Sequence, residues 1–295
     1  MADGAWEEVG ESAYRRRYEP YDVTVTAVVG SGGVAVVDTR CSLAEAREIK
    51  EDLRRLTAAP VRWVVNTHAH FDHCWGNAEF VAPRLNPSAR IWGHETLPPR
   101  LDPDSPEVVE RMARLAAEGP QWAQKVAELE FAAPTELVRD AAVLDLGDRA
   151  LELRHLGRGH TDGDLWILVS DAGKGSVSGA AADSGAALVL AGDLVEESGP
   201  PAFGSDSFPL EWAGTLDRGL GLLAPDAVVV PGHGAIVDPA FVREQRHAID
   251  AVAQEIRKLH AAGVPVESAL AEGTWPFPSK VLRSAITQGY AALHR

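Results

Sequence analysis

The sequence predicts a mixed α/β protein in which two β-sheets are covered by helices on their outer faces. Segments with the apolar pattern of strands alternate with segments of helical periodicity along most of the 295 residues. Some strand segments are apolar throughout, as expected for strands buried on both faces, whereas others alternate apolar and polar residues. We find no internal repeat of fixed short period, which argues against a solenoid or a propeller. Together these observations favour layered sheets and helices.

The first half of the chain is predicted to begin with a β-hairpin and a helix. Residues 22–38, DVTVTAVVGSGGVAVVD, carry β-branched residues on both sides of a glycine-rich turn. SLAEAREIKEDLRRL follows, with Ser42 as the expected N-cap and apolar residues at helical spacing. Residues 61–66, VRWVVN, form a short apolar strand, and a helix is expected to begin near Trp75. Residues 105–130 have helical periodicity with a break at Gly119 and Pro120.

The second half is predicted to contain four strands, a helix, another strand and a helical tail. Strands are expected near 142–146 and 149–155, with Gly147 and Asp148 as the turn, and at 164–170 and 187–193. A small-residue loop is expected at 171–185. A helix at 210–223, a strand at 226–230 and largely helical sequence from Pro239 complete the chain. We therefore expect a catalytic domain at 1–238 and a helical extension at 239–295 that packs on it.

The charge of the chain argues against nucleic acid as a partner. The formal net charge is −15, and such a surface repels phosphate backbones unless basic residues are tightly clustered. The run Arg15, Arg16, Arg17 is the one short basic cluster noted, and it is expected on a solvated surface. A small molecule is the expected partner.

Cysteine content and hydropathy predict a cytoplasmic protein without membrane association. The two cysteines, Cys41 and Cys74, give no support for a disulfide scaffold. The first residues, MADGAWEEVGES, are acidic and lack the apolar core of a secretory signal. No apolar run approaches the roughly 18 to 20 residues of a membrane span.

The stretch NTHAHFDHCWG gathers residues that are poor filler for a core. His68, His70, Asp72 and His73 fall within six positions, directly after a predicted strand. Residues i and i+2 of a strand share a face, so the first two imidazoles can point the same way while the last two residues curl back in a turn. Solvated loop residues are the alternative. The density of donors at a strand tip favours a metal site.

Three more candidate ligands follow at strand ends or in turns beside glycine. His160 lies in GRGHTDGD, Asp193 ends the strand LVLAGD, and His233 lies in VVVPGHG. Taken singly, each is more often a turn or cap residue. Their recurrence beside glycine, downstream of the histidine cluster, reverses that preference.

These seven residues, in this order, resemble the metallo-β-lactamase superfamily, whose pattern is His-x-His-x-Asp-His followed by His, Asp and His. The resemblance covers most of the chain, from residue 22 to PGHG at 231–234. It implies a four-layer αββα sandwich with a two-metal site at one edge. It further implies that one metal is held by His68, His70 and His160 and the second by Asp72, His73 and His233. Asp193 would bridge the two metals. Imidazole with carboxylate suits Zn²⁺, while iron and manganese are compatible with the same set.

The resemblance implies hydrolysis of a small acyl compound, which is an ester, a thioester, a lactone or a β-lactam-like amide. A metal-bound hydroxide is the expected nucleophile, and Asp72 is the expected catalytic residue that orients it or transfers a proton. An aspartate at position 193 resembles glyoxalase II and lactonase sites, since the best-known zinc β-lactamases have cysteine or serine there. Two alternatives remain: a single-iron oxygenase that acts on a persulfide, and a non-catalytic sensor that keeps its metal.

Several neighbours of the motif carry weaker expectations. Asp38 and Asp164 are candidates to accept a hydrogen bond from a ligating imidazole, although Asp38 is equally suited to cap the following helix. Cys74 is expected to be a small buried residue, and His94 a structural histidine. The segments 95–135 and 194–212 are expected to roof the site without a motif that names a substrate. The helical tail is expected to cover a sheet, complete the pocket or form a homodimer contact.

Overall fold

The computed structural model describes residues 5–81, 89–171 and 185–294. Its strands are β1 (Glu7–Gly10), β2 (Ala13–Tyr18), β3 (Val23–Gly30), β4 (Gly33–Val37), β5 (Val61–Val65), β6 (Arg90–His94), β7 (Glu136–Val138), β8 (Ala141–Asp145), β9 (Arg149–Arg154), β10 (Trp166–Asp171), β11 (Ala186–Glu196) and β12 (Leu223–His233). Its helices are α1 (Leu43–Leu56), α2 (Phe71–Cys74), α3 (Ala78–Val81), the 3₁₀-helix η1 (Pro98–Leu101), α4 (Pro106–Ala117), α5 (Pro120–Ala127), α6 (Trp212–Leu220), α7 (Pro239–Ala261), α8 (Val266–Glu272) and α9 (Ser279–Leu293).

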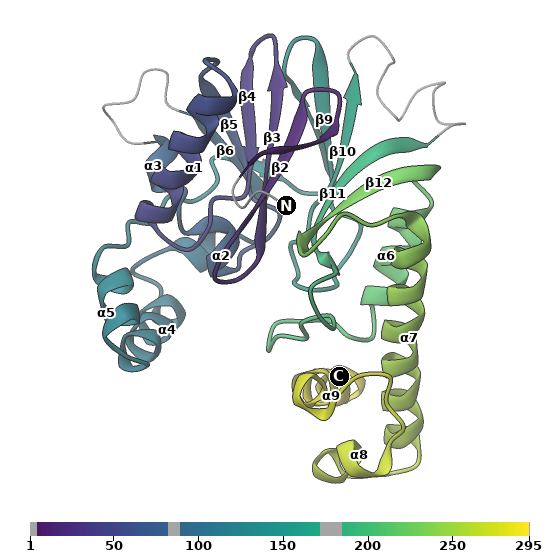
Figure 1. Cartoon of the computed structure of the whole chain (residues 1–295). Helices are drawn as coiled ribbons and strands as arrows, with labels where there is room; N and C mark the ends of the chain where they lie inside the picture. Colours follow the sequence, from purple (N-terminus) through teal and green to yellow (C-terminus); the bar gives the residue numbers. More distant parts are fainter. Residues whose placement is uncertain (1–4, 82–88, 172–184, 295) are drawn as a thin grey trace.

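The layers run helix, sheet, sheet, helix. In Figure 1, α1 and α3 lie outside the strands of the first half, and α6 and α7 lie outside those of the second half. The C-terminal helices α8 and α9 lie below, near the lower end of α7. The predicted αββα sandwich with a helical C-terminal extension is confirmed.

The strands form one hydrogen-bonded ladder that folds over on itself. Its order is β7-β6-β5-β4-β3-β12-β11-β10-β9-β8, with β2 paired to β3 and β1 paired to β2. The described pairing between β3 and β12 consists of one residue pair, Val23 with His233. The two halves of the sandwich therefore meet at a narrow seam, and His233 lies on it.

Strand alternation distributes apolar side chains into separate cores. Along β4, Ala35 and Val37 belong to the core between the two halves, while Val34 and Val36 belong to the core beneath α1. A third core packs the outer face of the second half against α6 and α7, and it also contains residues of α8 and α9. The C-terminal extension thus shares a core with the sheet that it covers.

Most predicted elements appear close to their expected bounds, and a few differ for local reasons. Ser42 caps α1 as predicted, since its side chain accepts a hydrogen bond from the backbone of Glu45. The expected helix near Trp75 begins earlier, at Phe71, because the turn that carries Asp72 and His73 is itself helical. The expected loop at 171–185 lies almost entirely outside the described residues.

The prediction for the basic run at 15–17 was wrong. These residues form part of β2, and only Arg17 is substantially exposed. Arg15 donates a hydrogen bond to the backbone carbonyl of Gly234, next to His233, and Arg16 pairs with the buried carboxylate of Asp52. Buried guanidinium groups are tolerated here because each finds an acceptor.

Among the described helices, none combines the length and apolar character needed to cross a membrane.

Candidate metal centre

The histidine motif is positioned by the end of a strand and the start of a short helix. After β5 ends at Val65, the chain passes through His68 and His70 and enters α2. The loop is fixed by its backbone, because Thr67 donates its N–H to Asp38 Oδ1 at 2.8 Å and accepts the N–H of Leu165 through its carbonyl. Such bracing holds the imidazoles before any ligand binds.

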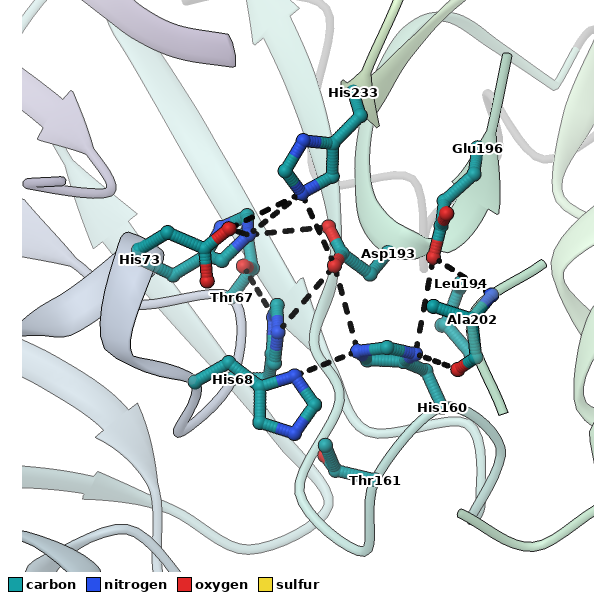
Figure 2. A network of polar contacts seen from close by, with 12 residues as sticks. Thr67, His68, His73, His160, Thr161, Asp193, Leu194, Glu196, Ala202 and His233 are labelled. Atoms are coloured by element: carbon teal, nitrogen blue, oxygen red, sulfur yellow. Dashed lines mark hydrogen bonds and ion pairs between the residues drawn. The ribbon is translucent and has the colours of Figure 1, made fainter. Parts of the chain in front are cut away.

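The remaining three candidate ligands come from the second half of the sandwich. His160 lies in the loop between β9 and β10, Asp193 lies within β11, and His233 ends β12. Figure 2 shows His68, His73, His160 and His233 arranged around Asp193. The structure thus brings together all seven residues that the sequence singled out.

The seven side chains form two groups, and within each group the candidate ligand atoms all lie within 4.8 Å of one another. One group is His68, His70, His160 and Asp193, and the other is Asp72, His73 and His233. In the first, His160 Nε2 lies 2.8 Å from His70 Nδ1 and 3.4 Å from Asp193 Oδ2.

Asp193 also reaches the second group. Its Oδ1 lies 3.2 Å from His73 Nε2, and its Oδ2 lies 3.3 Å from His233 Nε2. Asp72 Oδ2 lies 3.4 Å from the same nitrogen of His233. Asp193 is therefore the carboxylate that contacts both groups.

Each of the five imidazoles turns one ring nitrogen toward the centre and gives the other nitrogen an acceptor. The outward contacts are His68 Nδ1 with Thr67 Oγ1, His70 Nε2 with Asp206, His73 Nδ1 with Asp38, His160 Nδ1 with the carbonyl of Ala202, and His233 Nδ1 with the carbonyl of Tyr21. An outward acceptor fixes the tautomer that leaves the inward nitrogen free to bind a metal. This arrangement is that of metal-ligating histidines.

Asp38 orients two of these imidazoles. Its Oδ2 accepts from His73 Nδ1 at 2.7 Å and from Thr67 Oγ1 at 2.8 Å. Because the Thr67 hydroxyl donates its proton to the carboxylate, its lone pair is available to the Nδ1–H of His68, 3.0 Å away. One buried carboxylate therefore sets the tautomers of a ligand in each group.

The residues present fit a divalent cation. His68 Nε2 is buried and has no hydrogen-bond partner among the described residues. A buried polar atom without a partner costs about 1–3 kcal/mol, and a cation at this position would supply the partner. Five imidazoles and two carboxylates are a donor set suited to zinc and compatible with iron or manganese.

The electrostatics of the centre favour the protonation states that ligation requires at His68, His160 and Asp193. Burial, reinforced by neighbouring imidazoles, places the pKa of His68 well below its usual value and lowers that of His160 to about 3. Burial alone would raise the pKa of Asp193, but His73 and His233 hold it well below its usual range.

Two histidines of the centre attract protons when no metal is present. Despite burial, Asp193 and Asp72 raise the pKa of His73 well above its usual value. Asp193 likewise raises the pKa of His233 to about 9, again against the effect of burial. Cation binding would therefore displace protons from the second group, as expected for metal sites built on imidazole.

Two glycines allow the strands to approach the centre closely. A Cβ at Gly232 would lie 1.9 Å from Asp193 Oδ1, so no side chain fits there while the carboxylate keeps its place. Gly192, with φ of +52°, packs against Thr67. Gly232, next to His233, therefore leaves the space that the Asp193 carboxylate on the neighbouring strand occupies.

We expect Gly232→Ala to weaken metal binding about 10- to 100-fold, the size typical of disturbing the support of a ligand. The added methyl group must push Asp193 away from both groups of imidazoles. Titration of the metal-free protein with Zn²⁺ measures the change. Gly199→Ala is the matched control, because a Cβ there meets no atom within 4 Å. Equal affinities in the two variants would show that the placement of Asp193 is not critical.

The weaker expectations have mixed outcomes. Asp38 contacts an imidazole as predicted, whereas the prediction for Asp164 was wrong, since its carboxylate accepts from the N–H and hydroxyl of Thr161. Asp164 thus braces the turn beside His160. Cys74 is buried and its thiol points to the carbonyl of His70, as expected for a small packing residue.

His94 behaves as the structural histidine that was expected. It contacts the hydroxyl of Thr96 and the carbonyl of Arg139 through its two ring nitrogens. Phe71, beside the ligands, packs edge-on against Tyr21, Trp75 and Trp122, so it joins an aromatic cluster at the side of the centre.

Sequence reasoning missed Asp206. Its carboxylate lies 3.2 Å from His70 Nε2 and also pairs with Arg100, which in turn pairs with Asp162. Asp206 lies in a stretch rich in glycine, proline and serine, where no periodic pattern marks a buried contact. The carbonyls of Ala202 and Tyr21 were missed because backbone acceptors leave no signature in residue type.

Comparisons with known proteins agree with this geometry. A family model described as the metallo-beta-lactamase superfamily matches residues 18–233. Among curated proteins, the chain is similar to one from Homo sapiens named acyl-coenzyme A thioesterase MBLAC2. The two are 26% identical over 219 residues, which make up 72% of this chain and 68% of the relative.

Solved structures with the same fold include two kinds of enzyme. The sec-alkylsulfatase Pisa1 from Pseudomonas sp. aligns with a TM-score of 0.73 and 16% identity over 98% of this chain and 50% of that one, so this chain spans half of its length. A metallo-beta-lactamase from Pontibacter korlensis aligns with a TM-score of 0.57 and 18% identity over 83% of this chain and 98% of that one. At such identities the likeness shows the fold alone.

Proposed function

The chain belongs to the metallo-β-lactamase superfamily, and from this premise we propose that it is a two-metal hydrolase, with zinc as the expected metal, that cleaves small acyl compounds, thioesters first among them. The observation that carries the proposal is the common orientation of the five imidazoles around Asp193, with one nitrogen inward and the other on an acceptor. The thioester is chosen because the human relative is named as an acyl-coenzyme A thioesterase.

Two cations in these groups would lower the pKa of a bound water toward ~7 and polarise the substrate carbonyl. The protein holds the seven donor side chains in place and excludes water from the inner side of the centre. The side chains of His68, His73 and His160 are at most 2% exposed, whereas that of His70 is 27% exposed and that of His233 is 13% exposed. The substrate therefore reaches the centre from the side of His70 and His233.

Asp72 is the residue we assign to proton transfer. Its carboxylate lies beside His233 at the more open side of the centre, 3.4 Å from Nε2. From there it can accept a proton from the attacking water and return it to the departing group. A carboxylate in this position can also orient the water toward the substrate carbonyl.

The complete second group favours two metals over the single-iron alternative. One cation needs only His68, His70 and His160 with Asp193, whereas Asp72, His73 and His233 form a further set with ligand atoms equally close together. A single-iron oxygenase gives no role to these three donors, which converge on a common point.

Metal content and substrate turnover test the proposal together. We expect two divalent ions per chain, hydrolysis of an acyl thioester, loss of turnover after chelation and recovery on addition of Zn²⁺. A lactone, a phenyl ester and a β-lactam complete the substrate panel. One iron per chain with oxygen consumption on a persulfide would favour the oxygenase. Stoichiometric metal without turnover of any panel member would favour the sensor.

A further inference from the structure

A cavity of about 200 Å³ lies beside the metal centre. Its walls are the segment 205–211 that follows β11, Arg100 of η1, and Gln288, Ala291 and Ala292 of α9. Neither the ligand set nor the residues around it account for this space. The C-terminal extension thus contributes one wall of a cavity whose other walls belong to the catalytic domain.

Asp206 connects this cavity to the centre. Asp206 lines the cavity, and its carboxylate contacts His70 Nε2, 3.2 Å away. The opposite nitrogen of the same imidazole, Nδ1, faces the metal groups. Only the Asp206 side chain therefore separates the cavity from His70, which lies on the more open side of the centre.

The walls are held in place before any ligand binds. Ser284 of α9 donates a hydrogen bond to the carbonyl of Gly204 at 2.7 Å, and Arg257 of α7 donates to the carbonyl of Leu210 at 2.9 Å. The N–H of Phe208 donates to the carbonyl of Gly159, beside His160. These contacts are those of a preformed ligand pocket.

The chemistry of the walls favours an uncharged aliphatic chain. The apolar part of the wall is formed by Phe208, Pro209, Leu210, Ala291 and Ala292, and the uncharged polar side chains beside it are Ser205, Ser207 and Gln288. The cation in the wall, Arg100, is already paired with two carboxylates, and the acidic Glu211 is paired with Arg158. With no free positive charge among its lining residues, the cavity offers nothing to a phosphate group. These walls suit a hydrocarbon better than a phosphate-bearing carrier.

We propose that this cavity is the acyl-chain subsite, which binds the alkyl tail of the thioester while the thiol carrier stays outside it. The inference rests on the proposed function, because the tail is placed relative to a carbonyl at the metal centre. Burying each methylene is worth about 0.8 kcal/mol, so each one that enters should raise kcat/KM about fourfold. A methylene occupies nearly the ~30 Å³ of a water, so roughly six or seven carbons fill the space.

The test compares chain lengths in the metal-loaded enzyme and one variant. Acetyl, butyryl, hexanoyl and octanoyl thioesters are assayed, each on coenzyme A and on N-acetylcysteamine. Ala292→Phe adds a ring to the wall of the cavity from an exposed position of α9. We expect the variant to keep wild-type kcat/KM for acetyl thioesters and to lose most of the gain with chain length on both carriers. Ala251→Phe, at an exposed position of α7 that does not line the cavity, should match the wild type.

Three kinetic results would overturn the proposal. An unchanged dependence on chain length in Ala292→Phe would place the tail elsewhere, and so would an equal loss for acetyl and hexanoyl thioesters. If Ala292→Phe changed the ratio of kcat/KM on coenzyme A to kcat/KM on N-acetylcysteamine at fixed acyl length, the thiol carrier would be placed in the cavity. If the wild type cleaves no thioester, the proposed function fails separately, and calorimetry with 1-hexanol then decides. Binding with a negative heat-capacity change, lost in Ala292→Phe, would support an alkyl subsite, whereas no binding would overturn it.

Discussion

Replacing Asp193 by alanine is expected to remove bound metal and turnover together while leaving the fold largely intact. Its carboxylate contacts His160 in one group and His73 and His233 in the other. Loss of a residue that merely supports a ligand typically costs 10- to 100-fold in metal affinity, so loss of the shared carboxylate should cost more than about 100-fold. Elemental analysis, circular dichroism and the thioester assay measure the three properties.

Asp226→Ala is the matched control, because this aspartate lies in β12 with its side chain exposed. It should keep its metal and its activity. The fold should survive in the Asp193 variant because the three large cores are built from apolar side chains that do not include it. Full activity in Asp193→Ala would refute the bridging role, and gross unfolding would show that the carboxylate is structural.

The second large effect is expected for Asp38→Asn. The amide presents its own N–H₂ to one of the groups that now donate to the carboxylate, namely the Nδ1–H of His73, the hydroxyl of Thr67 and the N–H of Thr67. With the amide nitrogen at the Oδ2 position, His73 changes its tautomer or loses its contact. With the nitrogen at the Oδ1 position, it faces the N–H of Thr67 and removes the hydrogen bond that braces the histidine loop. In either orientation metal affinity should fall about 10- to 100-fold. Competition with a chelator of known affinity measures the loss.

Asparagine at position 38 also tests the orientation of the imidazoles without adding backbone strain. Asp38 has a φ of +66°, a region that asparagine tolerates better than most residues, so the expected loss is not an effect of the main chain. Thr67→Val removes the hydroxyl that contacts His68 and Asp38. Its effect should be smaller and should fall on the group containing His68, because His73 keeps its own contact with Asp38. Asp52→Asn changes another buried aspartate, whose carboxylate contacts Tyr18 and Arg16 and none of the seven candidate ligands, and it should leave metal affinity unchanged. Equal losses in the Asp38 and Asp52 variants would contradict the orienting role.

The fold could be predicted well where the sequence carries periodicity. The apolar runs that became β4 and β11 are buried on both faces, so their sequences are almost entirely apolar and indicate internal strands. The short strand β7 and the pair β1–β2 were missed. In β2, Arg15 is buried and Arg16 is half-buried, and both guanidinium groups are paired inside the fold, which residue type alone does not reveal.

The candidate site could likewise be predicted only in part from the sequence. Its inward-facing residues were found because histidine and aspartate at strand ends are unusual filler. The outer contacts were found only in part, since Asp38 had two equally good local roles and Asp206 lies 136 positions from the imidazole that it contacts. A contact between residues so far apart depends on how the second half folds back on the first, which no local pattern encodes.

The narrow seam between β3 and β12 has a consequence for how the two halves stay together. His68, His70, Asp72 and His73 come from one side of that seam, and the other three donors come from the opposite side, so neither half owns a complete coordination sphere. The apolar core between the halves and a few backbone hydrogen bonds, such as that from Leu165 to Thr67, already join them. An occupied centre would add coordination bonds to both sides, so bound cations would also stabilise the association of the two halves.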